Sequence, residues 1–129
     1  MEQRFDTNIS AALRGSLNPE RDRVRKLKAP SHMALAQLLT ESEEFHVIYI
    51  DGSHEPADVL TDAVLAWRLL LPGGLLILDD YMWHDVIAAD KLKCPKPGID
   101  AFLSVFGQEL IVLELRYQCV VQKVCATSL

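Results

Sequence analysis

The sequence is poor in cysteine, and it has neither a long apolar run nor an excess of positive charge. Cys94, Cys119 and Cys125 are odd in number and lack C-x-x-C spacing, so we expect reduced thiols and no zinc site. No apolar run reaches about 18 residues and no apolar signal region opens the chain, which predicts a cytoplasmic protein without membrane contact. The net charge of -5 gives no reason to expect nucleic acid as a partner.

What remains is an ordinary globular composition. Of the 129 residues, 50% are hydrophobic and 24% are charged, a balance that argues against disorder and allows a sizeable core. The chain shows no internal repeat and no low-complexity segment. We therefore expect residues 1–129 to form a single domain.

The stretch between Phe45 and Tyr81 reads as a strand, a helix and a second strand. The apolar run from Phe45 to Ile50 is short and β-branched, as in a buried strand. Asp51 and Gly52 then turn the chain, and apolar residues from Val59 to Leu70 recur at helical spacing, with Asp58, Asp62 and Arg68 off that stripe. The segment Pro72-Gly73-Gly74 is expected to end the helix, and Leu75 to Leu78 form the second strand.

Acidic residues follow both strands. Strands joined through a helix lie parallel, so Asp51, Asp79 and Asp80 should emerge at one edge of the sheet, where open α/β sheets bind ligands. Three converging carboxylates repel one another unless a cation or a proton neutralises them, and oxygen ligands suit Mg²⁺ or Ca²⁺. His54 follows Asp51 closely and is a candidate general base. Each residue alone reads as a turn or surface residue, but their joint placement favours a site.

These motifs carry a resemblance to a known family. The segments IYIDGSH and LLLPGGLLILDDY, with a helix between them, resemble the C-terminal portion of a class I S-adenosylmethionine-dependent methyltransferase. The most similar branch is that of the metal-dependent O-methyltransferases with a D-x-x-H motif. The resemblance implies that Asp51, Asp79 and Asp80 bind Mg²⁺ and that His54 takes the proton from the acceptor. The acceptor would be a hydroxyl of a small molecule or a sugar.

The flanking segments supply the rest of the expected α/β fold. We expect a helix over residues 2–14, a weak edge strand over 24–28, and a helix from Ser31, as N-cap, to Leu39. A helix over 99–106 precedes two strands, 110–115 and 117–124, with only Arg116 between them. The result is a Rossmann-like methyltransferase sheet lacking its first βαβ unit, with three parallel strands plus a C-terminal antiparallel hairpin.

The family's main cofactor-binding elements are absent from this sequence. Neither the glycine-rich loop nor the acidic residue that binds the ribose is found, so the chain reads as a truncated or degraded methyltransferase, or as the second half of one. The resemblance places Ser31 near the adenine of S-adenosylmethionine. Tyr81, Trp83 and His84 follow the proposed metal ligands and could line an acceptor pocket, although packing on the sheet explains the two aromatic residues equally well.

The missing unit leaves the strand at Phe45–Ile50 with one free edge. We expect the segment 24–28 to pair with it, in preference to pairing between two protomers, and we expect some homodimerisation in either case. Two other functions stay open. One is an inactive methyltransferase remnant that acts as a dimerisation or binding module. The other is a receiver-type phosphoacceptor domain, in which, unlike here, the acidic pair precedes the phosphorylated aspartate.

Overall fold

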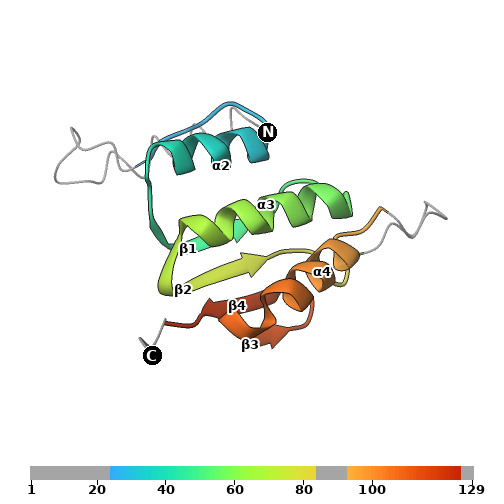
Figure 1. The fold of residues 1–129 in the computed structure, drawn as a ribbon. Coiled ribbons are helices and arrows are strands. Elements are labelled where there is room, and N and C mark those ends of the chain that lie inside the picture. Colours follow the sequence, from blue (N-terminus) through green and yellow to red (C-terminus); the bar gives the residue numbers. More distant parts are fainter. Residues whose placement is uncertain (1–23, 84–92, 126–129) are drawn as a thin grey trace, which may run out of the picture.

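The computed structural model describes residues 24–83 and 93–125, and Figure 1 shows their arrangement. Three helices, one short 3₁₀ turn and four strands follow one another in these residues. Their bounds are α2 (Ser31–Thr40), β1 (Phe45–Ile50), α3 (Pro56–Leu69), β2 (Leu70–Leu78), α4 (Lys96–Phe106), η1 (Gly107–Glu109), β3 (Leu110–Leu115) and β4 (Cys119–Lys123). The helix expected over residues 2–14 lies outside the described residues.

The four strands form one mixed sheet in the order β1-β2-β4-β3. Strands β1 and β2 are parallel and are joined through α3, which confirms the predicted βαβ unit. Strand β4 runs antiparallel to both β2 and β3, so the predicted C-terminal hairpin is also confirmed. Its turn is longer than predicted, because residues 116–118 rather than Arg116 alone connect the two strands.

The prediction of a third parallel strand over residues 24–28 is wrong. This segment is irregular and does not join the sheet. Arg25 instead donates two hydrogen bonds, of 2.6 and 2.8 Å, to the carboxylate of Glu41 just beyond the end of α2. Among the described residues β1 therefore pairs with β2 alone. The expected pairing of the segment 24–28 with β1 does not occur. Val47 and Tyr49 on β1 are about half exposed.

The segment Pro72-Gly73-Gly74 does not end the helix, as predicted, but forms an irregularity inside β2. Helix α3 ends at Leu69, and β2 begins at once with Leu70 opposite Phe45. The pairing then shifts until Leu75 lies opposite Val47. Gly73 has a φ of 81°, and a Cβ on Gly74 would lie 2.8 Å from the carbonyl oxygen of His46, so both positions require glycine.

Helix α3 lies between α2 and α4, and the three helices lie side by side along the sheet (Figure 1). The core forms where α3 and α4 meet β2 and β4. Trp67 packs edge-on against Phe102 at a centroid distance of 5.4 Å. The residues with no exposed surface are Ala63, Ala66, Leu76, Leu78, Ile99, Phe102, Cys119 and Val121. Ile48 and Ile50 of β1 are partly buried against this core, and the pairing of Ile50 with Leu78 places the carboxyl ends of β1 and β2 side by side.

The N-cap of helix α2 differs from the prediction. Pro30 rather than Ser31 occupies the N-cap position, which leaves the Ser31 hydroxyl available for another contact. The apolar residues Leu35, Leu38 and Leu39 are only partly buried, because α2 packs mainly against α3, and a pocket lies between Leu35, Leu38 and β1. Within residues 24–83 and 93–125, no helix has the length and apolar character needed to cross a membrane.

Candidate active site

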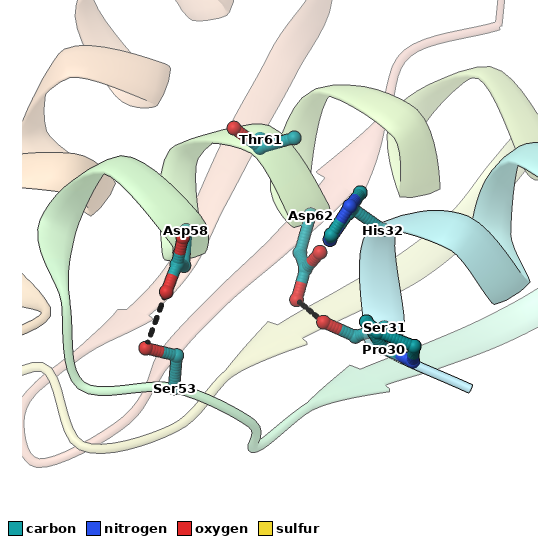
Figure 2. Close-up of a pocket in the computed structure, with 7 residues that line it drawn as sticks. All are labelled: Pro30, Ser31, His32, Ser53, Asp58, Thr61 and Asp62. Carbon is teal, nitrogen blue, oxygen red and sulfur yellow. Dashed lines mark hydrogen bonds between the residues drawn. The ribbon is translucent and has the colours of Figure 1, made fainter. Parts of the chain in front are cut away.

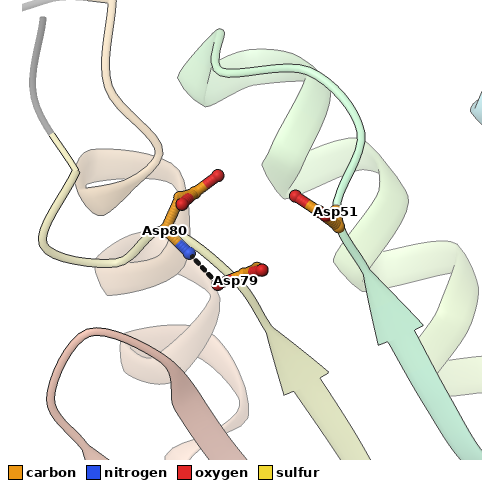
Figure 3. Close-up of side chains that lie close together, drawn as sticks. All are labelled: Asp51, Asp79 and Asp80. Atoms are coloured by element: carbon orange, nitrogen blue, oxygen red, sulfur yellow. Dashed lines mark hydrogen bonds between the residues drawn. The ribbon is translucent and has the colours of Figure 1, made fainter. Parts of the chain in front are cut away.

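Three carboxylates meet where β1 and β2 end. Asp51 directly follows β1, and Asp79 and Asp80 directly follow β2. The backbone N–H of Asp79 donates to the carbonyl of Ile50 at 3.0 Å, which extends the parallel pairing to the site. One carboxylate oxygen from each residue lies within 4.8 Å of the others, as Figure 3 shows. The convergence predicted from the strand ends is therefore confirmed, while metal binding stays a prediction.

The backbone conformation of Asp80 turns the side chains of Asp79 and Asp80 toward Asp51. In a regular strand two consecutive side chains point to opposite faces. Asp80 has a φ of 60°, in the left-handed region that aspartate tolerates better than most residues. Its N–H donates to Asp79 Oδ1 at 2.8 Å, and its carbonyl accepts from the N–H of Trp83 at 3.0 Å. This tight turn lets both carboxylates face the same space (Figure 3).

Neutral donors surround the two aspartates that follow β2. The Tyr49 hydroxyl donates to Asp79 Oδ2, and Gln118 Nε2 donates to Asp79 Oδ1 at 3.1 Å. The Tyr117 hydroxyl donates to Asp80 Oδ1 at 2.8 Å. The sequence analysis missed all three donors, because each reads only as part of a strand. The apolar run of β1 gives no sign that Tyr49 faces solvent, and no local signal brings Tyr117 and Gln118 to this edge.

The hydrogen bonds and the crowding of charge shift the pKa values in opposite directions. The bond from Tyr49 lowers the pKa of Asp79, and the same bond raises the pKa of Tyr49 to about 12. Partial desolvation, together with the carboxylates of Asp79 and Asp80, raises the pKa of Asp51. Repulsion between the carboxylates is therefore relieved only in part. A set of oxygen ligands this close together fits a hard divalent cation such as Mg²⁺.

His54 lies at this cluster, as predicted. Its Nε2 is 2.9 Å from Asp80 Oδ2, and its ring stacks on the indole of Trp83 at a centroid distance of 3.9 Å. Its side chain keeps 42% of its surface exposed, so a ligand can reach it. Trp83 also lies beside the cluster, through this stacking, whereas His84 lies outside the described residues.

Tyr81 is not brought to the cluster. Its side chain is buried, and its hydroxyl donates to Asp100 Oδ1 on α4 at 2.6 Å. Lys96 donates to the other oxygen of Asp100 at 2.6 Å. Desolvation and the bond to Asp100 raise the pKa of Tyr81. Tyr81 thus ties the end of β2 to α4, and its predicted acceptor contact gains no support from this placement.

Ser31 lines a cavity of about 420 Å³ between the N-terminal ends of α2 and α3 (Figure 2). Its hydroxyl donates to Asp62 Oδ2 at 2.6 Å. Asp62 is 2% exposed, and its Oδ1 has no hydrogen-bond partner among the described residues. The sequence placed Asp62 off the apolar stripe of the helix, and nothing in the periodicity indicated that α2 would bury it. The cavity is lined by Pro30, Ser31, His32, Ser53, Asp58, Thr61 and Asp62.

Several solved structures share this fold. MycE, a methyltransferase from the mycinamycin biosynthetic pathway, in complex with Mg, SAH and mycinamycin VI, is 20% identical, with a TM-score of 0.60 over 79% of this chain and 32% of its own. A protein of Corynebacterium glutamicum is 22% identical, with a TM-score of 0.63. The match covers 83% of this chain and 50% of that protein. An O-methyltransferase from Bacillus cereus in complex with SAH is 21% identical, with a TM-score of 0.51. The match covers 72% of this chain and 46% of that enzyme.

The chain thus spans between a third and a half of these structures, and the likeness establishes its fold. No curated protein sequence matches it significantly. A family model described as a methyltransferase domain matches residues 3–81, which is more than half of the chain and includes β1, α3, β2 and the acidic cluster. This chain therefore belongs to the methyltransferase-domain family.

Proposed function

We propose that the chain provides the acceptor half of an S-adenosylmethionine-dependent O-methyltransferase, which acts on a hydroxyl of a small molecule or a sugar. The observation that carries this proposal is the convergence of Asp51, Asp79 and Asp80, with His54 beside them, in a chain of the methyltransferase-domain family. The complex of MycE with Mg, SAH and mycinamycin VI supports a role for a metal and a small-molecule acceptor.

In this proposal the three aspartates would hold Mg²⁺ through carboxylate oxygens, and the cation would lower the pKa of the acceptor hydroxyl. Tyr49 and Gln118 hold Asp79 and keep it ionised, since the Tyr49 bond lowers its pKa. The pKa of Asp51 is raised by desolvation and by the two neighbouring carboxylates, and a neighbouring cation would offset that effect.

His54 removes the proton from the acceptor hydroxyl. When its Nε2–H donates to Asp80, the lone pair on Nδ1 is the one that can accept a proton. The acceptor oxygen then forms a bond to the methyl carbon, while the bond from that carbon to sulfur breaks and sulfur keeps the electron pair. Trp83 fixes the plane of the imidazole and forms a wall beside the acceptor.

The cavity at Ser31 is the proposed place for the adenine of the cofactor. Asp62 contributes a carboxylate to the lining of this cavity, and an amino group is the kind of donor that a carboxylate favours. The glycine-rich loop and the ribose-binding acid are absent from the sequence, and each lost charge-assisted bond costs roughly 1.5–3 kcal/mol. We therefore expect this chain alone to bind the cofactor only weakly.

The test is transfer of a radiolabelled methyl group from millimolar S-adenosylmethionine to a panel of polyhydroxylated small molecules and sugars. Transfer should need Mg²⁺, stop with a chelator, and fall strongly in His54→Ala and Asp79→Asn. Transfer that is insensitive to the chelator and to both substitutions would contradict the proposed roles. If no acceptor is methylated, the result favours the alternative of an inactive binding module.

One observation favours that alternative. The outer edge of β1 pairs with no strand among the described residues, and the apolar side chains of Val47 and Tyr49 on it are about half exposed. Open edges of this kind recruit further strands. A binding module that pairs with a second protomer through β1 is therefore our second candidate function.

A further inference from the structure

The turn between β3 and β4 lies directly against the acidic cluster. The backbone N–H of Tyr81, just after the cluster, donates to the carbonyl oxygen of Tyr117 in this turn at 2.7 Å. That contact places two side-chain donors of the turn on the two aspartates that follow β2. The hydroxyl of Tyr117 reaches Asp80 Oδ1, and the amide of Gln118 reaches Asp79 Oδ1.

Asp80 is held on both of its carboxylate oxygens. Oδ1 accepts from the Tyr117 hydroxyl at 2.8 Å, and Oδ2 lies 2.9 Å from Nε2 of His54. The side chain is only 17% exposed, and the backbone is in the left-handed region. The Tyr117 bond thus decides which way the carboxylate plane lies, and with it the direction of the oxygen that faces His54.

We propose that Tyr117 is a positioning residue for the metal and the general base. It fixes the Asp80 carboxylate so that this group can bind a divalent cation together with Asp51 and Asp79 while it orients His54. This inference rests on the proposed function, because it deepens the account of the same site. Residues that hydrogen-bond to metal-ligating carboxylates commonly contribute about 10–100-fold to metal affinity.

The position of Tyr117 separates this role from a role in folding. Its side chain is about half exposed and lies outside the buried core. Substitution by phenylalanine removes only the hydroxyl that contacts Asp80. Tyr81→Phe is a matched control, because it removes a tyrosine hydroxyl from the carboxylate of Asp100, which is not part of the cluster.

The experiment measures Mn²⁺ binding to the full chain by electron paramagnetic resonance in the wild type, Tyr117→Phe and Tyr81→Phe. We expect the Kd to rise about tenfold in Tyr117→Phe and to stay unchanged in Tyr81→Phe. In an Asp80→Asn background, the further substitution of Tyr117 should have little additional effect, because its partner is already changed. Cation binding should also perturb the tyrosine absorption of the wild type, and less so that of Tyr117→Phe.

The outcomes separate this inference from the proposed function. If the wild type binds Mn²⁺ and Tyr117→Phe binds it equally well, the positioning role is wrong while the metal site stands. If the wild type binds no Mn²⁺ at millimolar concentration, both the metal site and the role of Tyr117 are refuted. An equal loss in Tyr81→Phe would assign the effect to general destabilisation and would also overturn the inference.

Discussion

The imidazole of His54 lies nearly parallel to the indole of Trp83, with an angle of 16° between the rings. The two residues come from different parts of the site, since His54 precedes α3 and Trp83 follows the turn after β2. Together with the bond to Asp80, the stacking fixes the imidazole in one plane beside the carboxylates. If His54 acts as the proposed base, an imidazole held in this way would accept a proton without first reorganising.

The first prediction concerns this stack. Trp83→Ala should release the imidazole, because an aromatic pair contributes about 0.5–1.5 kcal/mol beyond its buried area. The ring current of the indole shifts the carbon-bound protons of His54 in the nuclear magnetic resonance spectrum, and the substitution should abolish that shift. His32, which is exposed at the start of α2, serves as the internal control. An unchanged His54 spectrum would show that the stack does not form in solution.

The second prediction concerns the buried carboxylate of Asp62. Ser31→Ala removes the donor to Asp62 Oδ2, and Oδ1 already has no partner among the described residues. Leaving a buried group without a partner should lower the free energy of unfolding by about 1–3 kcal/mol. Chemical denaturation measures this loss. Ser53→Ala removes a bond to the exposed Asp58 and one from the exposed backbone N–H of Glu55, and it should still cost less than Ser31→Ala because these groups can bind water instead. Equal losses would contradict the role of burial.

The third prediction follows from the tyrosines, all of which donate to aspartates. Tyr49 contacts Asp79, Tyr81 contacts Asp100, and Tyr117 contacts Asp80. The pKa of each phenol is raised, that of Tyr49 to about 12. For Tyr49 and Tyr117 the main cause is the hydrogen bond, which ionisation would break, whereas for Tyr81 it is burial, followed by the bond to Asp100. The bonds thus stabilise the fold below the ordinary pKa of 10.0, and this contribution is lost as the pH rises through the higher folded values.

Alkaline titration of tyrosinate absorbance tests this prediction. In the native protein all three phenols should ionise above pH 10.0, and in denaturant they should return to the ordinary value. A native titration with its midpoint at the ordinary value would contradict these hydrogen bonds.

The fourth prediction concerns association through β1. Its outer edge, which pairs with no strand within residues 24–83 and 93–125, and its exposed apolar side chains should support a homodimer at high concentration. Val47→Lys places a charge on this edge and should shift the protein toward monomer in sedimentation velocity measurements. Val105→Lys changes an exposed apolar residue on α4 and should have no such effect. A wild-type chain that is monomeric at every concentration would rule out the edge as an interface.

The sequence was sufficient to predict the βαβ unit and the convergence of the three aspartates. Both follow from local patterns, because strands joined through a helix are parallel and their carboxyl ends share one edge. The weak alternation of segment 24–28 resembles a strand, whereas in the structure Arg25 pairs with Glu41 and the segment does not join the sheet. This contact depends on the position of α2, which local propensity does not reveal.

The supporting residues of the site were also beyond prediction. Tyr117 reads as a hairpin residue, and its contact with Asp80 joins positions that are far apart in the sequence. The burial of Asp62 likewise depends on how α2 packs against α3. Residues that follow a strand directly can be placed from the topology, whereas side chains that reach the site from another element require the tertiary structure.

The central claim is that Asp51, Asp79 and Asp80 together bind a divalent cation, and calorimetric titration with Mg²⁺ tests it most directly. We predict weak binding to a single site, weakened at least about tenfold in Asp79→Asn and in Asp80→Asn. Asp100→Asn, which changes a carboxylate outside the cluster, should bind as the wild type does. Absence of binding to the wild type at millimolar Mg²⁺, or equal affinity in all four proteins, would contradict the account.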